Sequence, residues 1–254
     1  MIDTHAHLYL PEFDADRQRV LCSAREAGVT QCWLPGIDAS SIGPMRALYD
    51  TDKEYFRMFA GLHPTEVNSD YRSQLDVLEP LFSDRELSLY YYGVGEIGLD
   101  LYWDRTFARE QEEVLRCQLD WAVRCSKPVI LHVRNANDEI MPVVRDYYSK
   151  GLRGIFHCFS GDYEQARELI DHGFLLGVNG SITYKNNRQR PFLNRLPLSS
   201  LVTETDCPYL SPLPMRGRRN EPCHMKAVLE LLSDLFCLSY EEVENQTVIN
   251  ALNL

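Results

Sequence analysis

The chain has 254 residues, 44% of them hydrophobic and 25% charged, with a formal net charge of −11. This composition excludes a disordered chain, and no stretch approaches the roughly 18 consecutive apolar residues of a membrane span. The acidic balance excludes wholesale coating of nucleic acid, so a polyanion would need a focused positive site. With no charged and then apolar leader before the first expected strand, we expect a cytoplasmic protein.

Short β-branched or aromatic runs alternate with longer amphipathic runs, which is typical of βα units around a mostly parallel sheet. The eight expected strands are residues 2–8, 29–36, 56–63, 90–98, 128–134, 153–159, 174–180 and 200–206. Helical patterns are expected in the gaps, one from Asp14 to Gly28 and another from Gln111 to Val123. We therefore expect residues 1–254 to form one domain, a (β/α)8 TIM-type barrel with its active site at the C-terminal ends of the strands.

The first expected strand, IDTHAHL, carries His5 and His7 one residue apart. The two-residue period of a strand sends both imidazoles to one face, where they could share a metal ion. An isolated His-x-His is more often part of an exposed edge strand, so the other strands must decide.

Residue types that bind metals recur at the ends of the later strands. They are His63, Glu96, His132, His157 and Asp206. Each one alone would more commonly be a hydrogen-bonded structural residue. Their convergence on one barrel mouth instead predicts a metal site.

Two nearby residues are not expected to bind metal. His172 lies at the end of a helical pattern, where an imidazole favours the helix C-terminus. Cys158 follows His157 on a strand, so its side chain is expected to point toward the helices. Most of the eight cysteines are expected to be buried thiols, because the sequence has no Cys-x-x-Cys pair.

Seven motifs occur in a characteristic order: DTHAHL, GLHP, GEIGLD, LH-x-R-x-A, HCFSG, ETDCPYLSP and RRNEP. Together they resemble the TatD family of metal-dependent deoxyribonucleases over the whole chain. The resemblance implies a TIM-barrel metallohydrolase with two divalent ions that cleaves DNA, often as a 3′ to 5′ exonuclease. The implied ligands are His5, His7, Glu96 and Asp206 for one metal, with Glu96 bridging to a second metal held by His132 and His157. Zn, Mn, Mg and Co all suit such ligands, because no thiolate selects zinc.

Two carboxylates are the expected catalytic residues. Glu96 is expected to bridge the metals, and Asp206 is the candidate general base because a carboxylate beside a metal and its water can accept a proton. Glu204, on the same strand face as Asp206, could orient a ligand, hold an additional metal or pair with an arginine.

The expected substrate contacts lie further from the metals. They are His63, Arg134, Lys185, Arg219 and Tyr209. The cations could hold phosphates, His63 is a phosphate contact by the resemblance, and Tyr209 could stack on a base, as could Tyr102 and Trp103. Core packing is an equal alternative for Trp103, and Arg188 and Arg216 are expected on the solvated surface.

Three classes of function are compatible with these residues. The first is a deoxyribonuclease acting on DNA ends or single strands, since two dications and two carboxylates leave a site of about +2 that favours an anionic phosphodiester. The second is an acyl or amide hydrolase, such as a D-aminoacyl-tRNA deacylase or a small-molecule amidohydrolase. The third, a non-enzymatic metal-binding protein, is disfavoured because it needs no bridging carboxylate. No sequence feature indicates an oligomer, so a monomer is expected.

Overall fold

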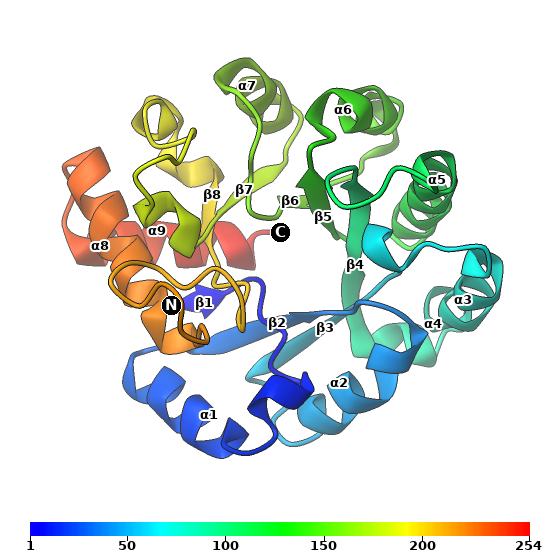
Figure 1. The fold of residues 1–254 in the computed structure, drawn as a ribbon, viewed down its shortest axis with the longest axis horizontal. Helices are drawn as coiled ribbons and strands as arrows, with labels where there is room; N and C mark the ends of the chain where they lie inside the picture. Colours follow the sequence, from blue (N-terminus) through cyan, green and yellow to red (C-terminus); the bar gives the residue numbers. More distant parts are fainter.

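The computed structural model describes residues 1–254 as a nearly closed barrel of eight parallel strands with helices outside it (Figure 1). The strands pair in chain order and are β1 (Ile2–Asp3), β2 (Gln31–Pro35), β3 (Phe56–Ala60), β4 (Tyr91–Asp100), β5 (Val129–Arg134), β6 (Gly154–Phe156), β7 (Leu175–Val178) and β8 (Leu201–Thr203). The expected fold class is therefore confirmed.

Nine α-helices follow or connect the strands. They are α1 (Arg17–Glu26), α2 (Ile42–Tyr49), α3 (Tyr71–Leu78), α4 (Pro80–Ser83), α5 (Ala108–Arg124), α6 (Asn137–Arg145), α7 (Tyr163–Asp171), α8 (Met225–Phe236) and α9 (Tyr240–Leu252). Local sequence explains several helix ends: Ser239 and Glu242 form a capping box at the start of α9, and Gly28 adopts a φ of 94° beyond the end of α1. None of these helices has the length and apolarity needed to cross a bilayer.

The first and last strands meet along a short seam of backbone hydrogen bonds. The Thr4 amide donates to the Thr203 carbonyl at 3.2 Å, and a parallel bridge joins Ala6 to Cys207. This seam runs beyond the ends of β1 and β8, so it fixes the backbone on which His5 and Asp206 lie.

A layer of apolar side chains fills the inside of the barrel. Its buried members are Ile2, Trp33, Phe59, Ile130, Ile155, Val202, Ala251 and Leu254. Six strands each supply one residue, and α9 with the C-terminus supplies the last two, which agrees with the central position of the C-terminus in Figure 1. This apolar layer therefore fills the interior of the barrel directly below the polar residues of the mouth.

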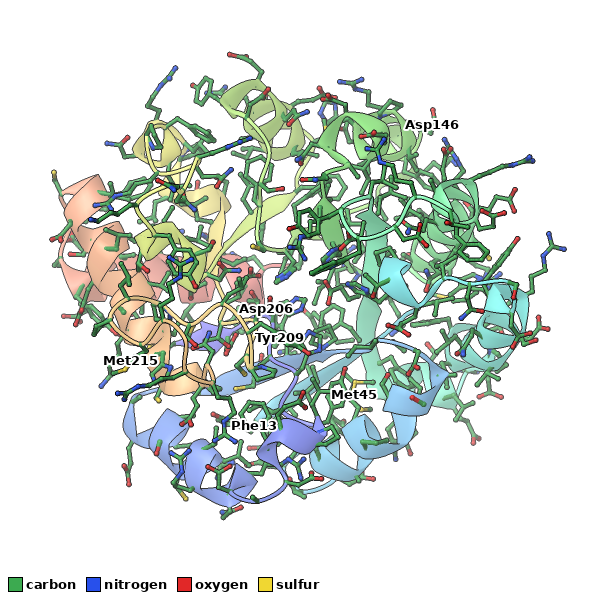
Figure 2. The ribbon with its side chains drawn as sticks, in the orientation of Figure 1. Phe13, Met45, Asp146, Asp206, Tyr209 and Met215 are labelled. Carbon is green, nitrogen blue, oxygen red and sulfur yellow. The ribbon has the colours of Figure 1, made fainter.

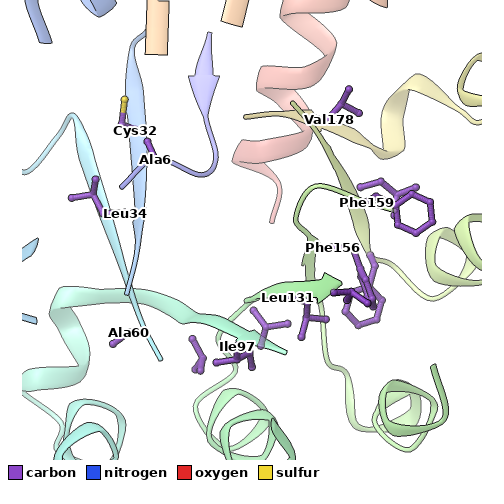
Figure 3. Packing of buried hydrophobic residues seen from close by; sticks show 14 of the residues in the cluster. Ala6, Cys32, Leu34, Ala60, Ile97, Leu131, Phe156, Phe159 and Val178 are labelled. Carbon is purple, nitrogen blue, oxygen red and sulfur yellow. The ribbon is translucent and has the colours of Figure 1, made fainter. Parts of the chain in front are cut away.

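The next residue along several strands points the other way, into a larger core between the strands and the helices. Leu34, Leu131 and Phe156 belong to that second cluster (Figure 3). Because strand side chains alternate between faces, one set of positions builds this outer core and the other builds the barrel interior. Full burial of each such side chain contributes about 1.5–3 kcal/mol.

Two sequence expectations need correction. The strands are shorter than expected at most of their C-terminal ends, so His5, His7, His63, His157 and Asp206 lie in the segments just beyond them, whereas Glu96 lies inside β4. The connection between β7 and β8 contains only 3₁₀ turns where a helical pattern was expected. That connection instead forms part of the barrel mouth.

Candidate metal centre

The inward-facing register of three strands leads directly to polar residues at the mouth. His132 lies two residues after Ile130, and His157 lies two residues after Ile155. Because the side-chain period of a strand is two, both imidazoles point the same way as the apolar layer below them. By the same alternation, Glu204, which lies two residues after Val202, also points into the barrel.

The segment after β1 is held in place by buried hydrogen bonds. The Asp3 carboxylate accepts hydrogen bonds from the backbone amides of His5 and Thr205, at 3.2 and 2.9 Å, and from the Thr205 hydroxyl at 2.6 Å. The Asp206 amide donates to the His5 carbonyl at 2.8 Å. These bonds fix His5 and Asp206 relative to one another before any ligand binds.

One group of potential ligand atoms gathers around His5 and His7. Their Nε2 atoms are 3.1 Å apart, and Glu96 Oε2 lies 3.0 Å from His5 Nε2 and 3.6 Å from His7 Nε2. Asp206 Oδ1 lies 3.7 and 3.6 Å from the same two nitrogens. We call these four residues the first donor group.

A second group surrounds the other oxygen of Glu96. Glu96 Oε1 lies 2.8 Å from His132 Nδ1, 3.4 Å from His63 Nε2 and 3.9 Å from His157 Nε2. Glu96 therefore presents one oxygen to each group. A register shift in β4 between Val94 and Ile97 accompanies this placement, as is common where a strand re-aims a side chain beside an active site.

The spacing of these atoms fits divalent ions. Ligands at about 2.1 Å from a common ion lie about 3.0–3.4 Å apart in octahedral or tetrahedral geometry. Most of the distances within the first donor group are close to this range. Two buried imidazole nitrogens that lie 3.1 Å apart and face two carboxylates therefore suit a metal ion.

The electrostatics of the cluster keep its carboxylates ionised. Burial opposes ionisation of Glu96, but the surrounding histidines, chiefly His5 and His63, hold its pKa well below its ordinary value. Burial likewise opposes ionisation of Asp206, yet His157 and the other histidines lower its pKa. Both residues are thus available as anionic ligands at neutral pH.

Two carboxylates behind the cluster orient its histidines. Asp100 Oδ2 lies 2.9 Å from His132 Nε2, which leaves Nδ1 facing Glu96. Glu204 Oε1 lies 2.9 Å from His157 Nδ1 and accepts a hydrogen bond from the Cys158 amide at 2.7 Å. Such partners fix the ring orientation of metal-binding histidines.

Glu204 is fully buried and is not paired with any arginine. A Cβ on Gly177 would lie 2.3 Å from Glu204 Oε2, so only glycine at that position leaves room for the carboxylate. Of the alternatives expected for Glu204, the contacts match the orienting role. The structure places its Oε1 against His157 and leaves Oε2 without a partner.

The cluster forms the floor of a hollow of about 1200 Å³ at the barrel mouth. Figure 2 shows Asp206 and Tyr209 close together near the middle of the ring of strands. The wall includes four cations that form no ion pair and two exposed aromatic side chains. These rim residues include Arg134, Lys185, Arg188, Arg216, Trp103 and Tyr209.

Of the expected substrate contacts, all but Arg219 line the hollow. Arg134, Lys185 and Tyr209 line the hollow, and so does His63, whose Nε2 belongs to the second donor group. Arg219 does not line it. Its guanidinium is held by the Asp16 carboxylate at 2.8 and 2.7 Å, which keeps it away from the mouth.

Arg188 and Arg216 are exposed, as expected. They also belong to the mouth, because the β7–β8 connection and the segment after β8 fold over it. The expectation for Cys158 is wrong: it lines the hollow, because strand alternation ends at His157 and the backbone turns at Cys158, whose φ is 43°. His172 lies at the end of α7 as expected, with Nδ1 2.8 Å from the Glu168 carbonyl oxygen.

Sequence reasoning missed the role of Asp100. This residue is the last letter of the GEIGLD motif and the last residue of β4. It lies four residues after Glu96, and the register between β4 and β5 sets Asp100 beside Arg134, two residues past His132. The sequence signal for this role was available, because Asp100 ends the same strand that carries the candidate ligand Glu96.

Comparisons with known proteins agree with this geometry. The family model described as TatD related DNase matches residues 2–254. The uncharacterized metal-dependent hydrolase YabD of Bacillus subtilis is 33% identical, covering 100% of this chain and 98% of its own length, and the 3′-5′ ssDNA/RNA exonuclease TatD of Pantoea ananatis is 29% identical with the same coverage. The crystal structure of the TatD homologue YjjV from Escherichia coli superimposes with a TM-score of 0.90 at 32% identity, covering 98% of this chain and 95% of that one.

Proposed function

The chain belongs to the family of TatD-related DNases and is a metal-dependent hydrolase, and we propose that its reaction is the two-metal hydrolysis of DNA phosphodiesters from 3′ ends of single strands. The relative from Pantoea ananatis bears the name of a 3′-5′ single-stranded DNA and RNA exonuclease. That name supports a nucleic acid substrate, and residues of this chain support it independently.

The observation that carries the proposal is the charge of the hollow. Four rim cations without carboxylate partners, Arg134, Lys185, Arg188 and Arg216, surround the donor groups, whereas Glu66 is the only acidic residue of the hollow outside the histidine cluster. The protein as a whole carries −11. Such a focused reversal of charge favours a polyanion over a small neutral amide.

The size of the hollow also favours a polymeric substrate over a small molecule. Pockets for small molecules typically enclose about 300–1,000 Å³, and this one, of about 1200 Å³, is larger and open to solvent. Tyr209 is half exposed, and its ring centroid lies 6.3 Å from that of His7. An aromatic ring beside the reacting centre suits stacking on a base.

Each group has a definable part in the reaction. Divalent ions held by the two donor groups would supply Lewis acidity at the scissile phosphate. The Asp206 carboxylate is 13% exposed, with Oδ1 toward the first donor group and Oδ2 3.8 Å from His157 Nε2, so it is placed to accept the proton of the attacking water. Arg134 and Lys185 would hold the flanking phosphates.

Strand polarity is tested with a 5′-labelled single-stranded oligonucleotide whose 3′ end is either free or blocked by an inverted nucleotide. We expect a ladder that shortens from the free 3′ end in the presence of Mg²⁺ or Mn²⁺ and that disappears with a chelator. Asp206→Asn protein prepared in parallel controls for contaminating nucleases. Equal cleavage of the blocked strand would overturn the polarity, and no cleavage with Mg²⁺, Mn²⁺, Co²⁺ or Zn²⁺ would overturn the nuclease assignment.

A further inference from the structure

The segment between β4 and α5 carries two exposed aromatic side chains. The Trp103 side chain is 72% exposed and that of Tyr102 is 50% exposed, with ring centroids 4.9 Å apart in an edge-to-face arrangement. The other two tryptophans, Trp33 and Trp121, are buried. Core packing therefore does not account for Trp103.

The aromatic pair is held by its neighbours. The Arg134 guanidinium lies 3.9 Å from the ring centroid of Tyr102 and 5.1 Å from that of Trp103. Its partners are thus π-faces, and no carboxylate pairs with it. The Leu101 amide also donates to the Arg134 carbonyl at 2.9 Å, which ties the base of the segment to β5.

The same segment is joined to the metal centre through Asp100. Asp100 Oδ1 accepts a hydrogen bond from the Tyr102 amide at 3.0 Å, while Oδ2 lies 2.9 Å from His132 Nε2. Trp103, Arg134 and His132 all line the one hollow. A strand bound in this hollow can therefore reach His132 and the exposed indole together.

From this arrangement we infer that Trp103, with Tyr102 and Arg134 behind it, is a stacking site for one unpaired nucleobase next to the scissile phosphate. This inference rests on the proposed function and adds the structural basis for choosing single strands. A base inside a duplex has both faces covered by its neighbours, so only an unpaired or frayed base can stack on the indole. Such stacking is sequence-tolerant, because every base has a π-face.

Fluorescence tests the inference without turnover, because Trp103 is the only exposed tryptophan. The probe is a single-stranded oligothymidylate with phosphorothioate linkages at its 3′ end, added to protein with and without chelator. In the free protein, we expect iodide to quench the fluorescence of Trp103. A bound strand should itself quench this fluorescence, and it should also protect Trp103 from quenching by iodide. Trp103→Phe should lose both signals. A strand that lacks bases at its last two positions should bind about tenfold more weakly.

Kinetics provide the second test, comparing normal strands with strands abasic at the last two positions. Trp103→Ala should raise KM for the normal strand about tenfold, leave kcat nearly unchanged and have little effect on the abasic strand. Trp103→Phe should retain most of the affinity, because the ring is kept. Leu89→Ala is the matched control, since Leu89 is 82% exposed and precedes β4 at the opposite end of the barrel.

The outcomes separate the two claims. If Trp103→Ala weakens normal and abasic strands equally, or if a bound strand leaves Trp103 fluorescence unchanged, the stacking site is wrong although the nuclease assignment stands. If the wild type cleaves no strand, the proposed function fails, and the fluorescence titration still decides whether a nucleobase stacks on Trp103.

Discussion

Glu204 Oε1 lies 2.9 Å from His157 Nδ1, while the Nε2 atom of the same ring lies 3.8 Å from Asp206 Oδ2. One buried carboxylate therefore sets the direction in which His157 presents its other nitrogen to the donor groups. Burial lowers the pKa of His157, but Glu204 and Asp206 outweigh it and hold that pKa well above its ordinary value. We therefore expect the pair to act as a unit in which Glu204 positions His157 as a metal ligand.

Replacing Glu204 should therefore weaken metal binding more than folding. We predict that Glu204→Gln lowers the affinity for Mn²⁺ or Zn²⁺ by about 10- to 100-fold, the usual cost of losing an orienting partner. Isothermal titration of chelator-stripped protein measures the affinity, and thermal unfolding measures stability. Glu230→Gln, on the exposed side of α8, is the matched control. An unchanged affinity with a lowered Tm would reduce Glu204 to a structural residue.

Metal content tests the two donor groups. The protein as isolated should carry about two divalent ions per chain, because Glu96 presents a separate oxygen to each group. His132→Ala should lower the content to about one ion and keep the fold, since the apolar layer below is made by other residues. Elemental analysis of the folded protein gives the count. Trace metal in an active wild type would contradict the mechanism.

The proton-accepting role of Asp206 predicts a specific kinetic defect. Asp206→Asn should lower kcat about 10²- to 10⁴-fold with a smaller effect on KM, as is usual when a positioned base is lost. Steady-state rates on a single-stranded oligonucleotide, with metal content measured in the same sample, provide the test. Near-normal turnover with metal retained would leave Asp206 a ligand only.

The rim cations predict a salt dependence. Affinity for single strands should fall with added salt, and Arg134→Ala or Lys185→Ala should each flatten the slope by about 0.7. Lys226→Ala is the control, because Lys226 is exposed on α8, does not line the hollow and forms no ion pair. Binding titrations at several salt concentrations measure the slopes. Equal slopes for the wild type and both rim variants would contradict the assignment of phosphate contacts.

The sequence was sufficient to predict the barrel and the residues around the metal centre because both follow from short-range regularity. Alternation along strands carries Ile130 to His132 and Ile155 to His157 on one face, and that period is visible in the sequence. Parallel strands in chain order then bring their C-terminal ends together.

The errors arise where long-range contacts decide. Arg219 was expected at the mouth, but it pairs with Asp16, which is 203 residues away in the chain. No local sequence pattern indicates that pair. Cys158 was misplaced because strand alternation ends at His157, and the backbone turns at Cys158, whose φ is 43°. Arg188 and Arg216 are exposed as expected, but their place on the rim of the hollow could not be predicted, because the course of their loops over the mouth depends on the whole barrel.

The most direct test of the central claim compares two substrates in one preparation. The purified wild type is assayed on single-stranded DNA and on D-aminoacyl-tRNA, each with and without chelator, with Asp206→Asn protein beside it. We predict chelator-sensitive release of nucleotides from DNA that is lost in Asp206→Asn, and no release of the D-amino acid. Metal-dependent deacylation of the tRNA with intact DNA would contradict the account and establish the acyl hydrolase in its place.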